Sequence, residues 1–212
     1  MTVRLGQIIP CKIRVVALGF VLSAIAWKAY RILTNYDDDK FVAVNVLGVQ
    51  HMGMNFKIDE FYIDRGSYGS AGRERDAGAF QCCMRLPKEW HPGMTVDLRW
   101  EISDWSQADP QQIDAGDLSS VTNGGIYKAI VPIEKYTTPG DIYVHFFLDK
   151  KVRIVVSNVL PESKRHPIPF TDEPTNSDAT VGKKVTKVFT PLEMAELRKK
   201  RDEDKRKFGD WR

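Results

Sequence analysis

The sequence predicts a mainly β fold, an antiparallel immunoglobulin-like sandwich of about seven strands with an N-terminal membrane helix and a C-terminal charged helix. Three observations predict it. Seven short β-rich segments follow one another between residues 41 and 158, with no helical period between them. A long apolar run occupies residues 15–27, and a helix-capping pattern begins at Thr190. We therefore divide the chain into an anchor (1–33), a β domain (34–159), a Pro-rich polar linker (160–189), a charged helix (190–207) and a tail (208–212).

The first 33 residues carry five basic side chains and no acidic one. As a helix, the apolar run spans roughly 20 Å, which is shorter than the bilayer core and typical of a signal peptide, with cleavage after Ala26. Alternatively, Lys28 and Arg31 snorkel outward and residues 13–33 form an uncleaved span. We predict a single-pass bacterial inner-membrane protein whose body lies in the periplasm. The cleaved, soluble periplasmic form is the alternative.

Charge is distributed unevenly over the rest of the chain. Residues 34–182 carry 15 basic and 22 acidic groups, a net charge of −7, whereas residues 183–212 carry 11 basic and six acidic groups, a net charge of +5. An acidic body repels phosphate backbones, so we predict no binding to nucleic acid and favour a basic or mixed-charge protein partner. The alternative is that the acidic residues only keep the protein soluble.

The predicted strands have turn signals between them. In the segment 95–105, apolar and polar residues alternate, which places Trp100 in the core and Asp97 and Glu101 on a face exposed to water. Two prolines and Gly93 indicate a turn at 87–93. Residues 66–78, with four glycines, are expected to be a long surface loop. The predicted strands are 41–50, 56–64, 81–86, 95–105, 125–133, 141–148 and 152–158.

Four prolines interrupt residues 160–174, so this segment is expected to be a tether or a strap lying on the domain. Thr190, Pro191 and Glu193 combine a capping box with a proline at the first helical position. They predict a helix that runs to about Lys205. Its second half is charged throughout, which suits a solvated helix, an anionic lipid surface or an acidic partner.

The sequence contains no motif typical of an enzyme or a metal site. None of the four histidines belongs to an HxxxH or HExxH pair, and Cys82 directly precedes Cys83 without the spacer of a zinc or redox motif. We predict no catalytic residue, no metal and no cofactor. Adjacent strand residues point to opposite faces, which favours free thiols for the two cysteines, with a strained redox-sensing bridge as the alternative.

Residues 81–93 (QCCMRLPKEWHPG), followed by 95–100 (TVDLRW), resemble the signature of a bacterial family of unknown function. The segments 44–49 (VNVLGV) and 142–147 (IYVHFF) resemble the parts of this family that open and close the domain. Its members are mostly short envelope proteins, often lipoproteins, and several are encoded beside type VI secretion lipase effectors. This chain lacks a lipidation cysteine after its apolar run.

The resemblance implies an immunity-type protein that neutralises a lipase-class effector by occluding it. The alternative is a non-catalytic adaptor or structural subunit of an envelope complex. Aromatic and charged side chains in loops suit an interface hot spot. The candidate contact residues are Tyr68, Trp90, His91, Asp97 and Glu101, and the candidate structural residues are Cys82, Cys83, Trp100 and Gly93.

Overall fold

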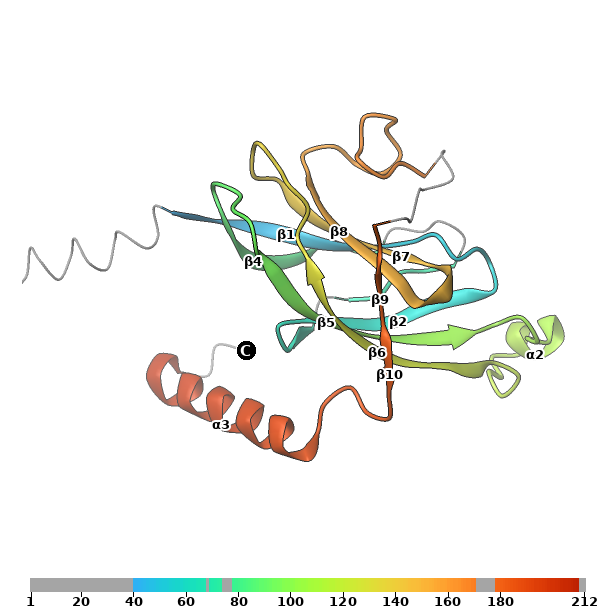
Figure 1. Cartoon of the computed structure of the whole chain (residues 1–212). Coiled ribbons are helices and arrows are strands. Elements are labelled where there is room, and N and C mark those ends of the chain that lie inside the picture. The colour runs from blue at the N-terminus through green and yellow to red at the C-terminus, as the bar shows by residue number, and fades with distance from the viewer. Residues whose placement is uncertain (1–39, 68, 74–77, 171–177, 210–212) are drawn as a thin grey trace, which may run out of the picture. The chain divides into compact units, whose positions relative to one another are not determined.

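The computed structural model describes residues 40–67, 69–73, 78–170 and 178–209 (Figure 1). The chain divides into two compact units, Met1–Val42 and Ala43–Arg212, and the second unit holds almost all the described residues. The predicted membrane segment 13–33, the cleavage site after Ala26 and the candidate contact residue Tyr68 lie outside them. Within the described ranges, no helix has both the length and the apolar character that crossing a bilayer requires.

The fold is mainly β, as predicted. The seven predicted strands correspond to β1, β2 and β4–β8, whereas β3, β9 and β10 come from segments expected to be loop or linker. The elements are β1 (Phe41–Gln50), β2 (Phe56–Ile63), β3 (Gly66–Ser67), β4 (Gln81–Pro87), β5 (Thr95–Asp104), α2 (Pro110–Asp114), β6 (Thr122–Pro132), β7 (Asp141–Phe147), the 3₁₀ turn η1 (Leu148–Lys150), β8 (Lys151–Ser157), β9 (Thr180–Val181), β10 (Lys183–Val185) and α3 (Pro191–Phe208).

The strands form two five-stranded sheets. Sheet A has the order β4-β1-β7-β8-β9, and sheet B has the order β10-β6-β5-β2-β3. Strands β1 and β7 pair in parallel, from Val46 opposite Ile142 to Gln50 opposite Phe146. The prediction of a wholly antiparallel fold was therefore wrong for this pair. Parallel neighbours need a long crossover, and here strands β2–β6 lie between β1 and β7 in the chain.

Apolar residues from the two sheets meet in a shared core. The ring of Phe146 on β7 lies 5.6 Å from that of Phe61 on β2 and 5.9 Å from that of Trp100 on β5, measured between ring centroids. Trp100, expected in the core, is 1% exposed. On β5, Val96, Leu98, Trp100 and Ile102 are buried at alternate positions, as a sheet with one apolar face requires.

The polar face of sheet B is not open to water everywhere. Arg99 lies between Asp97 and Glu101 on that face, and the expectation of a wet face predicted it to be exposed. It is 3% exposed, because its guanidinium group donates to Val188 O, just before α3, and to Glu193 in the first turn of α3. The C-terminal segment therefore covers the middle of this face.

The described part of residues 160–189 lies against both sheets. Ile168 is 1% exposed and belongs to a cluster of buried side chains on sheet A. Strand β9 pairs with β8 of sheet A, and β10 pairs with β6 of sheet B. Gly182 joins these two strands, and a β-carbon at this position would overlap the Trp100 ring. The chain thus crosses from one sheet to the other directly over the core.

Helix α3 begins as its capping box predicts. Thr190 Oγ1 accepts a hydrogen bond from Glu193 N at 3.2 Å, and Glu193 Oε2 accepts one from Thr190 N at 2.8 Å. Farther along the helix, Glu196 pairs with Arg65 at 2.7 Å. The described side chains from Arg198 onward are exposed.

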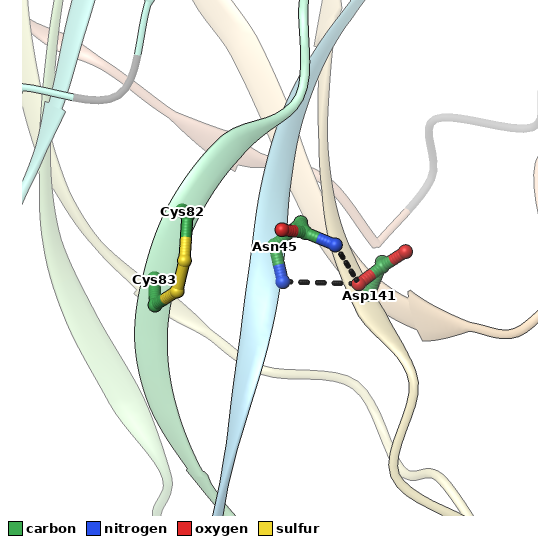
Figure 2. Close-up of a disulfide and its surroundings, with 4 residues drawn as sticks. All are labelled: Asn45, Cys82, Cys83 and Asp141. Atoms are coloured by element: carbon green, nitrogen blue, oxygen red, sulfur yellow. Dashed lines mark hydrogen bonds between the residues drawn. A yellow bond between two sulfur atoms is a disulfide. The ribbon is translucent and has the colours of Figure 1, made fainter.

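Cys82 and Cys83 lie on β4 at the edge of sheet A, and both are exposed (Figure 2). A disulfide joins them, and the peptide bond between them is cis. The structure therefore departs from the favoured expectation of free thiols and has the bridge that the sequence left as the alternative. Free thiols were expected only for regular strand geometry at these two residues. On the neighbouring strand, the backbone and side-chain nitrogens of Asn45 both donate to Asp141 Oδ1, at 3.0 and 3.1 Å.

Candidate partner-binding site

The turn after β4 fixes two of the candidate contact residues. Gly93 has a φ of +87°, a left-handed conformation that glycine adopts without strain. Trp90 is half-buried, and its indole Nε1 donates to Ile133 O at 2.9 Å. His91 is exposed. The turn therefore presents His91 to solvent, while the indole of Trp90 partly serves to hold the turn in place.

Asp97 lies on β5, and its polar atoms bind other residues of this chain. Its Oδ2 accepts from Arg99 Nη2 at 2.7 Å, and its Oδ1 accepts from Arg99 Nε at 3.2 Å. Its backbone N donates to Asp64 Oδ1 at 2.9 Å. Since Arg99 also binds Glu193, Asp97 serves the attachment of α3 and is a poor candidate for contacting a partner.

Glu101 belongs to a cluster of three carboxylates that the pairing register of β2 and β5 brings together. The antiparallel pairing of β2 and β5 sets Glu60 directly opposite Glu101. A register shift between Ile58 and Glu60 brings Asp59 to the same face, where it accepts a hydrogen bond from Ser103 Oγ. We call Asp59, Glu60 and Glu101 the acidic triad.

The electrostatics of the acidic triad are unfavourable in the isolated chain. Partial burial raises the pKa of the Glu101 carboxyl above its usual value, and the charges of Glu60 and Asp59 raise it further. Lys57 lies 3.5 Å from Asp59, and Tyr62 donates its hydroxyl to Glu60. Among the residues that the structure describes, no cationic group pairs with Glu101. A cation brought to this place would relieve the repulsion between the carboxylates.

A pocket of about 240 Å³ opens beside the triad. This is below the roughly 300–1,000 Å³ typical of small-molecule sites, so the pocket suits one side chain of a partner better than a cofactor. Its rim is partly apolar, since Leu118 is 55% exposed. The pocket is lined by Asp59, Glu101, Ile102, Ser103, Leu118, Val121, Thr122 and Asn123.

The predicted contact residues thus fall into separate places. His91 and Trp90 lie in the turn after β4, Asp97 lies under the start of α3, and Glu101 lies in the acidic triad. Strand alternation predicted that Glu101 faces outward. It did not identify Asp59 and Glu60 as its neighbours, because the sequence of neither strand specifies the pairing register of β2 and β5. The consecutive acidic residues in β2 were the available signal.

Three of the four histidines gather elsewhere, on sheet A. His51 Nε2 and His145 Nδ1 are 2.8 Å apart, and the ring centroid of His166 lies 5.2 Å from that of His145. His145 lies on β7, and its Nδ1 takes part in this hydrogen bond. Within the described ranges, no three His, Cys, Asp or Glu side chains are arranged to hold a metal ion.

The fold and the site define a class, a mainly β protein of two packed sheets with an acidic patch on the outer face of one of them. The family model described as "Protein of unknown function (DUF3304)" matches residues 52–154, which run from the end of β1 into β8. The matched segment includes the acidic triad and the turn with Trp90 and His91. No curated protein and no solved structure matches the chain.

Proposed function

We propose that this chain is a membrane-anchored, exported binding protein without catalytic activity, of the immunity type that neutralises a lipase-class effector. The acidic triad is the observation that supports a binding role. Three carboxylates held together on a sheet, beside a pocket the size of one side chain, form a preorganised receptor for a lysine or arginine. The link to a type VI effector rests on the family resemblance. An immunoglobulin-like arrangement of the strands remains part of the proposal.

The mechanism is occlusion. Two paired strands of sheet B, β2 and β5, hold the triad, so little conformational entropy is lost when a partner binds. A basic side chain inserted beside Glu101 gains charge-assisted hydrogen bonds and removes the repulsion between neighbouring carboxylates. The exposed turn with His91 is a second contact on the same domain. Because this chain acts by covering the effector's active site, it needs no catalytic activity of its own.

The direct experiment mixes the purified chain with a lipase-class type VI effector and measures both complex formation and lipase activity. We expect a stable complex and loss of lipase activity. Glu101→Gln should weaken the complex by about 10-fold or more, because a hydrogen bond to a charged group contributes about 1.5–3 kcal/mol. The same variant should leave the free protein as stable as before or more stable, since it removes a carboxylate that its neighbours repel.

Asp149→Asn is the matched control. It makes the same change in charge at an exposed residue in the turn after β7, in the other sheet, and asparagine tolerates its φ of +58°. This variant should bind the effector like the wild type. Equal binding by Glu101→Gln and the wild type would refute the acidic triad as the contact, and full lipase activity in the mixture would refute the immunity role.

An adaptor that uses its tail helix is the second candidate, and the exposed, charged second half of α3 favours it. Removing all of residues 183–212 would be a poor test, because it also takes away β10 and the partners of Arg99. Truncation after Glu196 keeps both. We expect this truncated chain to retain protection against the effector, whereas an adaptor would lose its function.

A further inference from the structure

The structure brings three histidines together where one segment of the chain lies on sheet A. His51 follows β1, His145 lies on β7, and His166 belongs to residues 160–170, which we call the strap. The ring centroids of His51 and His145 are 5.1 Å apart, and those of His145 and His166 are 5.2 Å apart. His145 is fully buried, and His166 is 3% exposed. The histidines therefore form the contact between the strap and sheet A.

The strap covers an apolar face of sheet A. Its Ile168 is buried, and Phe170 packs against the same cluster. The strap also has backbone hydrogen bonds of its own, including the one that Phe170 N donates to Pro161 O at 2.9 Å. Exchange of the Phe170 amide therefore requires the strap to unfold locally as it leaves the sheet. The buried residues of the cluster are Leu47, Val49, Tyr143, Phe147, Val155 and Ile168.

The hydrogen bonds of the histidines suit neutral rings. The bond between His51 Nε2 and His145 Nδ1 needs one nitrogen without a proton. His166 Nδ1 lies 3.1 Å from Ile168 N and 3.0 Å from Ile168 O, so it can accept from the amide only while it carries no proton. His145 Nε2 and His166 Nε2 are buried and have no hydrogen-bond partner among the described residues. A doubly protonated ring at either position would leave a charged N–H group buried without an acceptor.

The charges around the histidines also oppose protonation of His145. Arg153 on β8 lies opposite His145 in the sheet register and forms an ion pair with Glu134. From β7, Tyr143 packs its ring edge against His166, 4.7 Å away between centroids. From the strap, Glu162 is the acidic group that acts on His166. Burial is the main cause that lowers the pKa values of His145 and His166, and for His166 it outweighs the backbone hydrogen bond with Ile168 and the charge of Glu162, which both act to raise the pKa.

We propose that the strap is a pH-sensitive cover, which lies on sheet A while His145 and His166 are neutral and opens when the solution becomes mildly acidic. In the open form both rings reach water and take up protons at their ordinary pKa of about 6.5, so acidification favours the open form. Opening uncovers the apolar face of sheet A. This inference does not depend on the proposed immunity role, because it concerns the other sheet and needs no partner.

Hydrogen exchange of the Phe170 amide measures the opening. Between pH 7.5 and 5.5, each histidine that stays neutral in the closed form raises the opening equilibrium by about tenfold, so two histidines raise it by up to about 100-fold. After correction for intrinsic exchange rates, the protection of Phe170 should fall by that factor. The amide of Leu98, in the centre of sheet B, should keep its protection, since only the strap opens.

The variant His145→Gln/His166→Gln should remove most of this pH dependence, and His166→Gln alone should remove about half of it on a logarithmic scale. His91→Gln is the matched control, because His91 is exposed and outside the cluster, and it should behave like the wild type. Histidine titration of the unmutated protein by NMR gives an independent measurement that needs no variant. The proposal is overturned if His145 and His166 titrate near pH 6.5 while Phe170 stays protected, or if Leu98 and Phe170 lose protection together.

Discussion

Arg99 and Glu193 lie 94 residues apart in the sequence and form a two-point ion pair on the outer face of sheet B. Arg99 Nη2 donates to Glu193 Oε1 at 2.7 Å, and Nη1 donates to Oε2 at 3.1 Å. The Arg99 side chain is 4% exposed, so solvent screens this pair less than a surface pair. Glu193 also closes the capping box of α3. One carboxylate therefore both starts the helix and attaches it to the sheet.

Glu193→Gln separates these two roles. Glutamine keeps the capping box but removes the charge that Arg99 binds. We expect a loss of about 1.5–3 kcal/mol in the attachment of α3, the typical contribution of a hydrogen bond to a charged group. The measurement is hydrogen exchange of Met194 N, which donates to Thr190 O in the first turn. Glu203→Gln, at an exposed position of the same helix, should change the exchange by less than about 0.5 kcal/mol.

The attachment of α3 should also depend on pH. Hydrogen bonds from Arg99, and then the backbone of Thr190, hold the pKa of Glu193 well below its usual value of 4.5. Because the attached form keeps Glu193 ionised, its stabilising contribution is complete above pH 4.5 and declines as the pH falls below that value. Hydrogen exchange of the Met194 amide, corrected for intrinsic rates, should speed up only in this acidic range. In Glu193→Gln this dependence on pH should disappear. An unchanged pH profile in that variant would contradict the assignment.

Gly182→Ala should destabilise the fold where the chain crosses between the sheets. A β-carbon at this residue overlaps the Trp100 ring and comes within 3.2 Å of Lys150 O. Overpacking of this kind typically costs about 1–3 kcal/mol in the free energy of unfolding, which urea denaturation measures. A double-mutant cycle with Trp100→Phe provides the control. The cost of Gly182→Ala should be smaller in the Trp100→Phe background, and additive effects would show that the ring is not the obstacle.

Phe146→Ala should destabilise the protein by about 3–5 kcal/mol, since its ring lies between Phe61 and Trp100 and its removal leaves a cavity at the centre of the core. Urea denaturation again gives the free energy of unfolding. Ile130→Ala is the control, because Ile130 is an apolar residue of sheet B that is 62% exposed. That substitution should change stability by no more than about 0.5 kcal/mol. Similar effects of the two variants would contradict the assignment of the core.

Local patterns were sufficient to predict several elements. Alternation along the segment 95–105 placed Trp100 inside and Glu101 outside, because successive strand residues point to opposite faces. The capping box at Thr190 located the start of α3 for a similar reason, since its hydrogen bonds join residues only three positions apart. The match of a family of unknown function to residues 52–154 is consistent with the resemblance drawn from the cysteine pair and the turn that follows it.

The sequence by itself thus determined seven of the strands, the core position of Trp100 and the capped helix, because neighbouring residues in the chain decide all of these. Only the tertiary structure decided the parallel pairing of β1 with β7 and the meeting of Glu60 with Glu101. It also decided the burial of Arg99 under Glu193 and the gathering of three histidines between the strap and sheet A. Each of these joins residues distant in the sequence. The register and direction of strand pairing bring together the first two, and the packing of α3 and the strap against the sheets brings together the others; no local pattern encodes either.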